Sequence, residues 1–240
     1  MLSLSVVIPT FRGTPGGVIE GLLCALRDRS LEIIVVDDGS GAPWGGRLER
    51  LAEGYEDLRV ITLPERRGQA YATLVGVASA KAEVIVTIDD DGDHPPEAVP
   101  ELLSALEGGY DLVYGAPARG RTKGLRRLGT VLNNCLFTVC LGKPLRVPVT
   151  SFRAFRRQLR DAALRRPVRF GYLSAMLFSA NPRTEVRYYR QPEGKVRVRR
   201  GSRYGVRRLV ALYGNLLLHW GPLRPLSAFS GLPKRRFGYR

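Results

Sequence analysis

The sequence predicts an α/β protein built on a Rossmann-like, mostly parallel sheet with helices on both faces. In the first 117 residues, short runs rich in Val, Ile and Leu alternate with stretches of helical spacing, a pattern typical of parallel sheets. Acidic residues follow two of these runs, where ligands of such sheets bind. A chain of 240 residues that is 44% hydrophobic can also bury a full core.

The first half contains five predicted strands and four predicted helices. Apolar runs bounded by polar or turn residues predict strands at Leu4–Pro9, Glu32–Asp37, Leu58–Leu63, Val84–Ile88 and Asp111–Tyr114. Amphipathic spacing predicts helices near Gly17–Arg29, Gly46–Gly54, Gly68–Ala80 and Pro96–Gly108. Pro95 and Pro96 should stop the fourth strand and stiffen the turn that follows it.

The second half is less regular. Apolar stripes predict helices over Arg126–Leu141 and Tyr204–Trp220, Ser151–Arg157 is a predicted strand, and Val186–Val198 alternates weakly. The tail from Pro222 contains three prolines and a basic cluster, and is not expected to form a core of its own. We therefore expect an α/β domain over residues 1–200 and a basic amphipathic extension over residues 201–240.

Charge divides the chain into an acidic and a basic half. Residues 1–117 contain 9 Lys and Arg against 19 Asp and Glu, a net charge of −10, whereas residues 118–240 contain 29 against 3, a net charge of +26. The basic half should seek phosphate, on nucleic acid, on an anionic bilayer or on a phosphorylated substrate.

Compartment is indicated by what the sequence lacks. No apolar run reaches about 18 residues, so no membrane-spanning helix is expected. The first ten residues resemble a strand, without the basic start and cleavage site of a signal peptide. Cys24, Cys135 and Cys140 lie in apolar stretches without metal-ligand spacing, which predicts reduced core residues of a cytoplasmic protein.

The most informative segment runs from Asp89 to Asp93. Its four carboxylates at the end of the Val84–Ile88 strand repel one another, and a divalent cation such as Mg²⁺ or Mn²⁺ would remove that repulsion and share its coordination with phosphates. A solvated acidic turn is the alternative. We favour the metal because Asp37 and Asp38 end an earlier strand and should face the same crevice.

Several motifs, in order, resemble the family 2 glycosyltransferases. In chain order they are Val6–Phe11, Ile34–Ser40, Arg67–Ala72, Asp89–Asp91 with His94–Glu97, Ser151–Arg153 and Arg197–Tyr204. Within that family the chain is similar to the branch of dolichol-phosphate mannose synthase and bacterial polyprenyl-phosphate glycosyltransferases. The resemblance implies a GT-A fold over residues 1–200 and transfer of a sugar, with inversion, from a GDP- or UDP-sugar to a polyprenyl phosphate.

The resemblance also implies a donor site. Asp89 and Asp91 would bring Mg²⁺ or Mn²⁺ to the diphosphate, with Asp91 catalytic and Asp93 as an added metal ligand. Asp38, with Asp37 beside it, would accept hydrogen bonds from the base or ribose, although Asp37 could instead cap the turn before Gly39. The other donor-binding residues implied are Pro9, Thr10, Phe11, Gln69, Asp90, Arg197 and Arg203.

Basic residues would hold the phosphates. Arg153 matches the arginine of the family's Ser-Phe-Arg segment and is expected to be catalytic, while Arg126 and Thr130, with Arg119 nearby, would bind the acceptor phosphate. Because a lipid phosphate is already an anion, no general base is required. His94 is then expected to orient the metal loop, and His219 to pack.

The chain departs from the family pattern at several positions. Phe11-Arg12-Gly13 replaces Tyr-Asn-Glu, so an acidic contact to the base or ribose is missing, and Arg66 replaces an Asn. These changes affect sugar and acceptor recognition more than binding of the metal and diphosphate.

Three questions about partners stay open at this point. The helix over Tyr204–Trp220 is expected to lie on an anionic membrane, placing the protein peripherally at the cytoplasmic inner face, or else to pack on the domain. A soluble hydroxyl acceptor, such as a natural product or cell-wall precursor, is the alternative to the lipid. A basic nucleic-acid-binding protein is a distant alternative, since pI ≈ 10.5 permits it, but the acidic half would repel phosphate.

Overall fold

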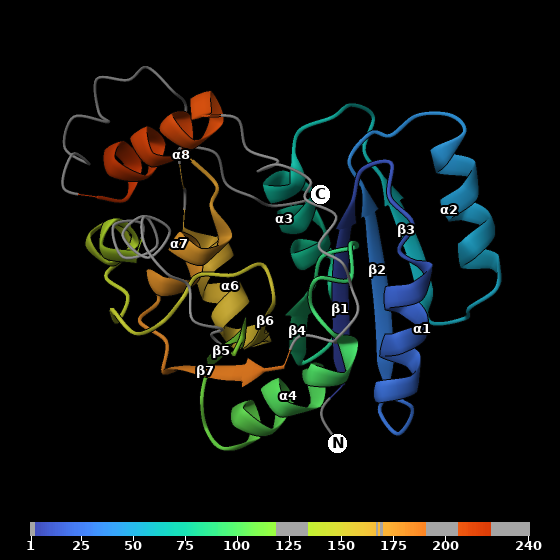
Figure 1. Ribbon diagram of the computed structural model, residues 1–240, viewed down its shortest axis with the longest axis horizontal. Coiled ribbons are helices and arrows are strands. Elements are labelled where there is room, and N and C mark those ends of the chain that lie inside the picture. Colours follow the sequence, from blue (N-terminus) through green and yellow to red (C-terminus); the bar gives the residue numbers. More distant parts are fainter. Residues whose placement is uncertain (1–2, 119–133, 167, 169, 191–205, 222–240) are drawn as a thin grey trace.

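A computed structural model describes residues 3–118, 134–166, 168, 170–190 and 206–221. Its centre is a seven-stranded sheet in the order β3-β2-β1-β4-β6-β5-β7 (Figure 1). The predicted α/β class with a mostly parallel sheet is confirmed. Some residues expected at the site lie outside the described residues, namely Arg119, Arg126, Thr130, Arg197 and Arg203.

Four parallel strands form one half of the sheet, and their apolar runs place them in the interior. They are β1 (Leu4–Thr10), β2 (Leu31–Asp37), β3 (Leu58–Thr62) and β4 (Val84–Thr87). Every residue of β1 and of β4 is buried. Such strands lack polar and apolar alternation because helices cover both faces.

The other half contains one reversed strand. β6 (Arg153–Arg156) is antiparallel to both β4 and β5 (Leu112–Pro117), and β7 (Thr184–Tyr189) is parallel to β5. The start of β6 and the end of β7 therefore lie at the edge where β1, β2 and β4 end. Thr87 pairs with Arg153 in this register.

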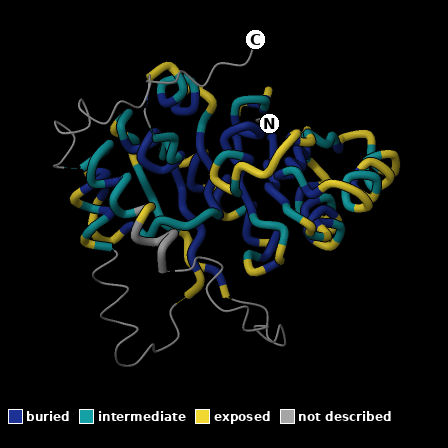
Figure 2. The backbone as a smooth tube through the Cα atoms, turned by 90° about the horizontal axis from the view of Figure 1, so that it is seen from above, coloured by how far each residue is buried: buried dark blue, intermediate teal, exposed yellow. Residues whose placement is uncertain are grey.

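Helices cover the two faces of the sheet and form two apolar clusters with it. The elements are α1 (Gly16–Ala25), α2 (Trp44–Glu53), α3 (Gln69–Ser79), the short 3₁₀ helix η1 (Pro96–Ala98), α4 (Val99–Glu107), α6 (Arg157–Arg165) and α7 (Leu173–Phe178), with a further helix over residues 134–141. α1, α2 and α4 bury their apolar residues in one cluster, and α3, α6 and α7 bury theirs in the other. Figure 2 shows the buried positions concentrated at the centre and the exposed ones on outer helices and loops.

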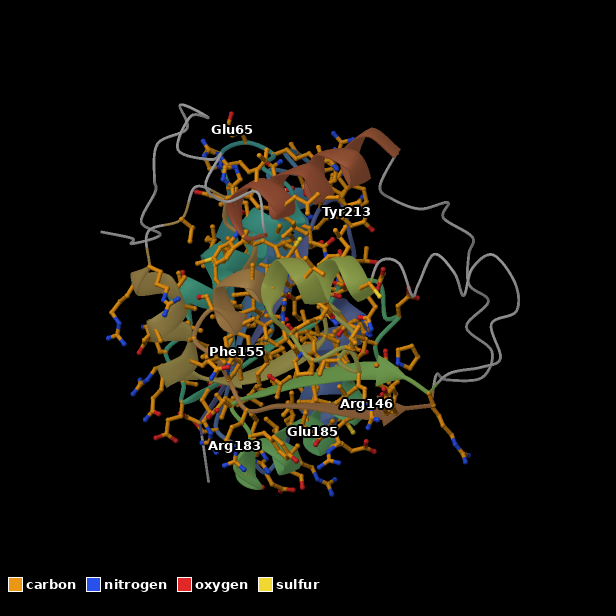
Figure 3. The ribbon with its side chains drawn as sticks, turned by 90° about the vertical axis from the view of Figure 1, so that its left-hand side faces the viewer. Glu65, Arg146, Phe155, Arg183, Glu185 and Tyr213 are labelled. Carbon is orange, nitrogen blue, oxygen red and sulfur yellow. The ribbon has the colours of Figure 1, made fainter. Side chains whose placement is uncertain are left out.

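The last described helix, α8 (Val206–His219), packs on the domain. Leu216 is fully buried in the cluster of α3, α6 and α7, and the indole Nε1 of Trp220 donates to the carbonyl of Phe170 at 3.0 Å. Tyr213 contacts Phe137 edge to face, with ring centroids 6.2 Å apart, where α8 lies above helix 134–141 (Figure 3). The packing alternative therefore describes this helix, because part of its apolar face is already buried against protein.

The sequence leaves two features of the second half unpredicted and misplaces two cysteines. α6 and α7 were not predicted, and β6 runs against its neighbours, because its strand pattern contains no information on direction. Cys24 and Cys135 are exposed and only Cys140 is buried. An apolar neighbourhood in sequence did not place the first two in the core, since each lies on the outer face of its helix.

Among the described residues, no helix is long and apolar enough to cross a membrane.

Leucine truncations on α8 test its packing. Leu216→Ala should lower the free energy of unfolding by about 2–4 kcal/mol, because it leaves a cavity in a closed core. Leu218→Ala is the matched control. Leu218 is on the same helix, is partly exposed and is not among the residues packed on the cluster, so its loss should be well below that of Leu216. Urea unfolding of both variants measures the difference, and equal small losses would contradict the packing.

Candidate active site at the carboxyl edge of the sheet

Asp89 is the centre of the candidate site. It lies two residues after the end of β4, and its side chain is 19% exposed. Gln69, at the start of α3, donates from Nε2 to Oδ1 at 2.6 Å, and the hydroxyl of Ser151 donates to Oδ2 at 2.6 Å. Both carboxylate oxygens are thus oriented by side chains from other elements. Burial raises the pKa of Asp89, and the nearby charge of Asp91 raises it further.

His94 lies behind Asp89 and connects it to β7. Its Nε2 is 3.3 Å from the Ser151 hydroxyl and 4.0 Å from Oδ2 of Asp89, and its Nδ1 is 2.5 Å from the Tyr189 hydroxyl. The imidazole also stacks on Phe152, with ring centroids 5.2 Å apart. Burial lowers the pKa of His94, which favours the neutral ring. These contacts fix the ring of His94 beside Asp89, and the orienting role of His94 stays a prediction.

Arg153 is buried beside the acids. Its Nε donates to the Thr87 hydroxyl at 3.2 Å, one terminal nitrogen donates to Ser174, and the guanidinium lies 5.9 Å from the centre of the Tyr114 ring. Of the ion pairs formed by described residues, none involves Arg153. The guanidinium of Arg153 is hydrogen-bonded to neutral hydroxyl groups, and its positive charge lowers the pKa of Asp89. A buried cation so arranged favours an anion in the adjoining space.

Asp37 is the last residue of β2, Asp38 follows it, and both are buried. The carboxylate of Asp37 accepts hydrogen bonds from the backbone N–H and the hydroxyl of Ser40. This is the turn cap that the sequence left as the alternative for Asp37. Gly39 within this turn has φ +67°, and a side chain there would collide with backbone at Glu65.

Asp38 ties β2 to the loop before α3. Its carboxylate accepts from the backbone N–H of Arg67 at 2.7 Å and of Gly68 at 2.8 and 2.9 Å, while Nε of Arg66 lies 3.9 Å away. These bonds hold the start of α3, and therefore Gln69, next to Asp89.

The end of β1 contributes a second contact. The hydroxyl of Thr10 donates to Oδ2 of Asp90 at 2.6 Å. A Cβ on Gly13 would collide with that carboxylate and with the Thr10 hydroxyl. The carboxylate of Asp90 thus occupies the space beside residue 13, where the chain lacks the family's acidic side chain. Its position depends on the glycine.

Aromatic and cationic groups cover the rest of the β1 end. Pro9 is buried within β1, and Phe11 follows it with a half-buried ring. The guanidinium of Arg66 lies 3.8 Å from the Phe11 ring centre, and that of Arg12 lies 5.2 Å away. These distances are typical of cation–π contacts, so the two arginines and the ring form one surface beside Asp38.

The acids fit a divalent cation that is shared with phosphates. Among the described residues, no three His, Cys, Asp or Glu side chains gather as a metal cage. Asp91 and Asp93 are exposed, and Asp91 accepts from the backbone N–H of Asp93 at 3.1 Å. The arrangement thus differs from a three-acid cage of Asp89, Asp91 and Asp93. Mg²⁺ commonly takes one or two carboxylates and completes its shell with substrate phosphate and water, and added positive charge would relieve the burial of Asp89.

Two residues that contribute to this geometry were not identified as site residues from the sequence. The sequence places Ser151 in a family motif and Tyr189 in the weakly alternating segment Val186–Val198, but it assigns neither residue a role at the site. Ser151 reaches Asp89 because β6 is reversed, and Tyr189 reaches His94 because β7 joins the sheet beside β5. Lys143 also supports the segment before Ser151, since its buried Nζ donates to Asn134 at 2.7 Å and to the Val147 carbonyl at 2.6 Å.

Comparison with known families gives one match over most of the chain. The family model for glycosyl transferase family 2 matches residues 5–181. An undecaprenyl-phosphate 4-deoxy-4-formamido-L-arabinose transferase from Proteus mirabilis is 30% identical over 235 residues, which is 93% of this chain and 70% of that protein. The transferase of the same name from Edwardsiella ictaluri is 29% identical and covers 95% of this chain and 72% of its own length.

Solved structures share the fold at low identity. A mannosyl-3-phosphoglycerate synthase from Rubrobacter xylanophilus superposes with a TM-score of 0.62 and 17% identity, covering 100% of this chain and 79% of its own. A mannosyltransferase from Pyrobaculum calidifontis, in complex with GDP-Man and Mn²⁺, gives 0.53 and 21%, covering 78% of this chain. The matched region spans 55% of that mannosyltransferase. Both are similar to this chain in the GT-A fold.

A glycine pair tests the close approach at Asp90. Gly13→Ala should lower the free energy of unfolding by about 1–3 kcal/mol, because the added methyl group displaces the Asp90 carboxylate from Thr10. Gly17→Ala is the control, since a Cβ there meets nothing within 4 Å and alanine favours the helix. Urea denaturation compares the two. A Gly13→Ala protein as stable as Gly17→Ala would contradict the crowding at this position.

Proposed function

The chain belongs to glycosyl transferase family 2, and from this premise we propose that it transfers a sugar from a nucleotide-sugar donor to a polyprenyl phosphate. The single observation that carries the proposal is the edge of the sheet at Asp89. There, an oriented carboxylate lies just beyond the end of β4, and a buried guanidinium, that of Arg153, lies at the start of β6 and interacts with it electrostatically. That arrangement suits a cation-bound diphosphate that gains charge as it leaves.

We assign the donor site to this edge. Asp89 and Asp91 would hold Mg²⁺ or Mn²⁺, with Asp93 near enough in sequence to add a ligand through water. When bound, the cation supplies a positive charge to the diphosphate oxygens. Gln69 and Ser151 hold the Asp89 carboxylate in place, and Arg153 adds a second positive charge from the protein side.

The nucleoside would lie over the ends of β1 and β2. The surface formed by Phe11, Arg12 and Arg66 borders the buried carboxylate of Asp38, and Pro9 and Thr10 form the floor beside it. Asp90 is held by Thr10 in the same crevice. Asp37 supports this region through the turn at Ser40. Arg197 and Arg203 are proposed to complete the diphosphate contacts.

The proposed step is a direct displacement. An oxygen of the acceptor phosphate attacks the anomeric carbon, and the bond from that carbon to the diphosphate oxygen breaks with its electron pair leaving on the diphosphate. Inversion follows from attack opposite the leaving group. No proton is removed from the nucleophile, so none of the described residues is required to act as a general base.

The acceptor proposal rests on charge and on the relatives. The basic half, residues 118–240, has a net charge of +26, which favours phosphorylated partners. The proteins from Proteus mirabilis and Edwardsiella ictaluri are named as undecaprenyl-phosphate transferases. Arg119, Arg126 and Thr130 are the proposed acceptor-phosphate ligands. We further propose that the enzyme works at the cytoplasmic face of an anionic membrane, with residues 201–240 contributing positive charge.

Removing one acid tests the reaction. Asp91→Ala, like Asp89→Ala, should reduce transfer by at least about 1000-fold while leaving the fold intact, because the charge that holds the cation is lost. Glu97→Ala, an exposed acid shortly after the loop, is the control and should keep its activity. Mass spectrometry of products from undecaprenyl phosphate with UDP- and GDP-sugars, with Mn²⁺ or with a chelator, measures transfer.

The transfer assay also tests the soluble-acceptor alternative, and a separate binding assay tests the nucleic-acid alternative. If a product forms only on a soluble hydroxyl acceptor, the proposal of a lipid acceptor is wrong. Full activity of Asp91→Ala, or transfer that a chelator leaves unchanged, would contradict the metal assignment. Binding to a DNA duplex with a steep salt dependence and without any nucleotide-sugar binding would favour the nucleic-acid alternative.

Vesicle binding tests the membrane proposal. The protein should sediment with phosphatidylglycerol vesicles at low salt and be released by salt, since Leu216 of α8 is buried in the domain and positive charge supplies the attraction to the anionic surface. Phosphatidylcholine vesicles are the neutral control. Equal sedimentation with both lipids, or none with either, would contradict an electrostatic association.

A further inference from the structure

A chain of three hydrogen bonds connects β7, the outermost strand of the sheet, to the Asp89 carboxylate. It begins at the Tyr189 hydroxyl on the last residue of β7, passes through His94, and ends with Ser151 on Oδ2 of Asp89. We propose that Tyr189 is a positioning residue, which sets His94 and Ser151 so that Asp89 is preorganised for the cation of the donor complex. This inference rests on the proposed function of the Asp89 site.

The direction of the chain follows from counting protons. The Ser151 hydroxyl has one proton and donates it to Asp89 at 2.6 Å, so its oxygen can only accept from His94 Nε2. A neutral imidazole that donates from Nε2 accepts at Nδ1. The Tyr189 hydroxyl, 2.5 Å from Nδ1, is then the donor. Each hydrogen bond thus selects the tautomer or rotamer of the next group.

Packing holds the same groups in place. His94 stacks on Phe152 and meets the Tyr189 ring edge to face, with centroids 6.0 Å apart, and the rings of Phe152 and Tyr189 are 5.7 Å apart. Phe152 is fully buried and fits because Gly115 has no side chain to collide with it. The ring positions are therefore fixed by contacts that survive removal of one hydroxyl, which allows the hydrogen-bond role to be tested alone.

The consequence concerns the carboxylate that would hold the cation. Groups that hydrogen-bond to metal ligands commonly change metal affinity by about 10–100-fold when they are removed. Ser151 contacts Asp89 directly, whereas Tyr189 acts through two intervening groups. We therefore expect a graded effect, largest at Ser151 and smaller at Tyr189, on binding of the cation.

Two adjacent tyrosines provide a matched pair for the test. Tyr189→Phe removes the hydroxyl at the start of the chain and keeps the buried ring, while Tyr188→Phe removes the hydroxyl of a side chain that is 52% exposed on the neighbouring position. Electron paramagnetic resonance titration of Mn²⁺, in the presence of UDP and separately of GDP, measures cation affinity without turnover. Thermal unfolding without metal reports on the fold.

The expected result is weaker Mn²⁺ binding in Tyr189→Phe and in Ser151→Ala, and unchanged binding in Tyr188→Phe. Tyr189→Phe should weaken Mn²⁺ binding on the order of threefold to tenfold, and Ser151→Ala by about tenfold or more, while Tyr188→Phe matches the wild type. In a His94→Gln background, Tyr189→Phe should add no further loss, because the route to Asp89 is already cut. A purely structural role of Tyr189 would instead add its effect in both backgrounds.

The outcomes separate this inference from the proposed function. If the wild-type protein binds Mn²⁺ and Tyr189→Phe and Tyr188→Phe bind it with the same affinity, the inference alone is overturned. An additive loss from Tyr189→Phe in the His94→Gln background would also overturn it. A wild-type protein that binds no Mn²⁺ with either nucleotide would overturn both. If Tyr189→Phe proves unstable, the comparison of His94→Gln with Ser151→Ala still tests the chain, since equal affinity to wild type in both would refute it.

Discussion

The structure depends on holding a largely buried carboxylate, that of Asp89, just beyond the end of a central strand. Burial and neighbouring acid make its ionised form costly, and several parts of the fold offset that cost. Gln69 from α3 and Ser151 before β6 each donate to one of its oxygens, and Arg153 contributes positive charge from within the sheet. Moving any one of these elements would remove part of that compensation, and under the proposed function the same arrangement would receive a cation and a diphosphate.

The reversed strand β6 brings the compensating groups to the acids. In an all-parallel sheet, the start of a strand lies at the opposite edge from the end of its neighbour. Because β6 is antiparallel to β4, its first residue, Arg153, pairs with Thr87 at the carboxyl edge. β7 then ends at that edge as well, which places Tyr189 against His94. The reversal of β6 therefore brings Ser151 and Arg153 to Asp89, while Tyr189 arrives at the end of β7, which runs in the same direction as β5.

Family 2 membership and the local geometry support each other at this edge. The family model ends at residue 181, before Tyr189, so the contact between β7 and His94 lies beyond the matched segment. The structure also shows what surrounds two residues that depart from the family pattern, Gly13 and Arg66. Gly13 leaves room for the Asp90 carboxylate, and Arg66 lies over the Phe11 ring beside Asp38. Both substitutions lie near the ends of β1 and β2, where the proposed function places the nucleoside.

The sequence by itself determined the strand and helix order of the first half, the two acidic strand ends and the family. Local apolar runs and turn residues contain that information, since each depends on neighbours within a few positions. Only the tertiary structure decided that Asp37 caps a turn, that α8 packs on the domain instead of presenting its whole apolar stripe to a membrane, and that Ser151 and Tyr189 reach the site. Those outcomes depend on strand direction and on contacts between distant segments, which a local pattern of hydrophobic and charged residues does not encode.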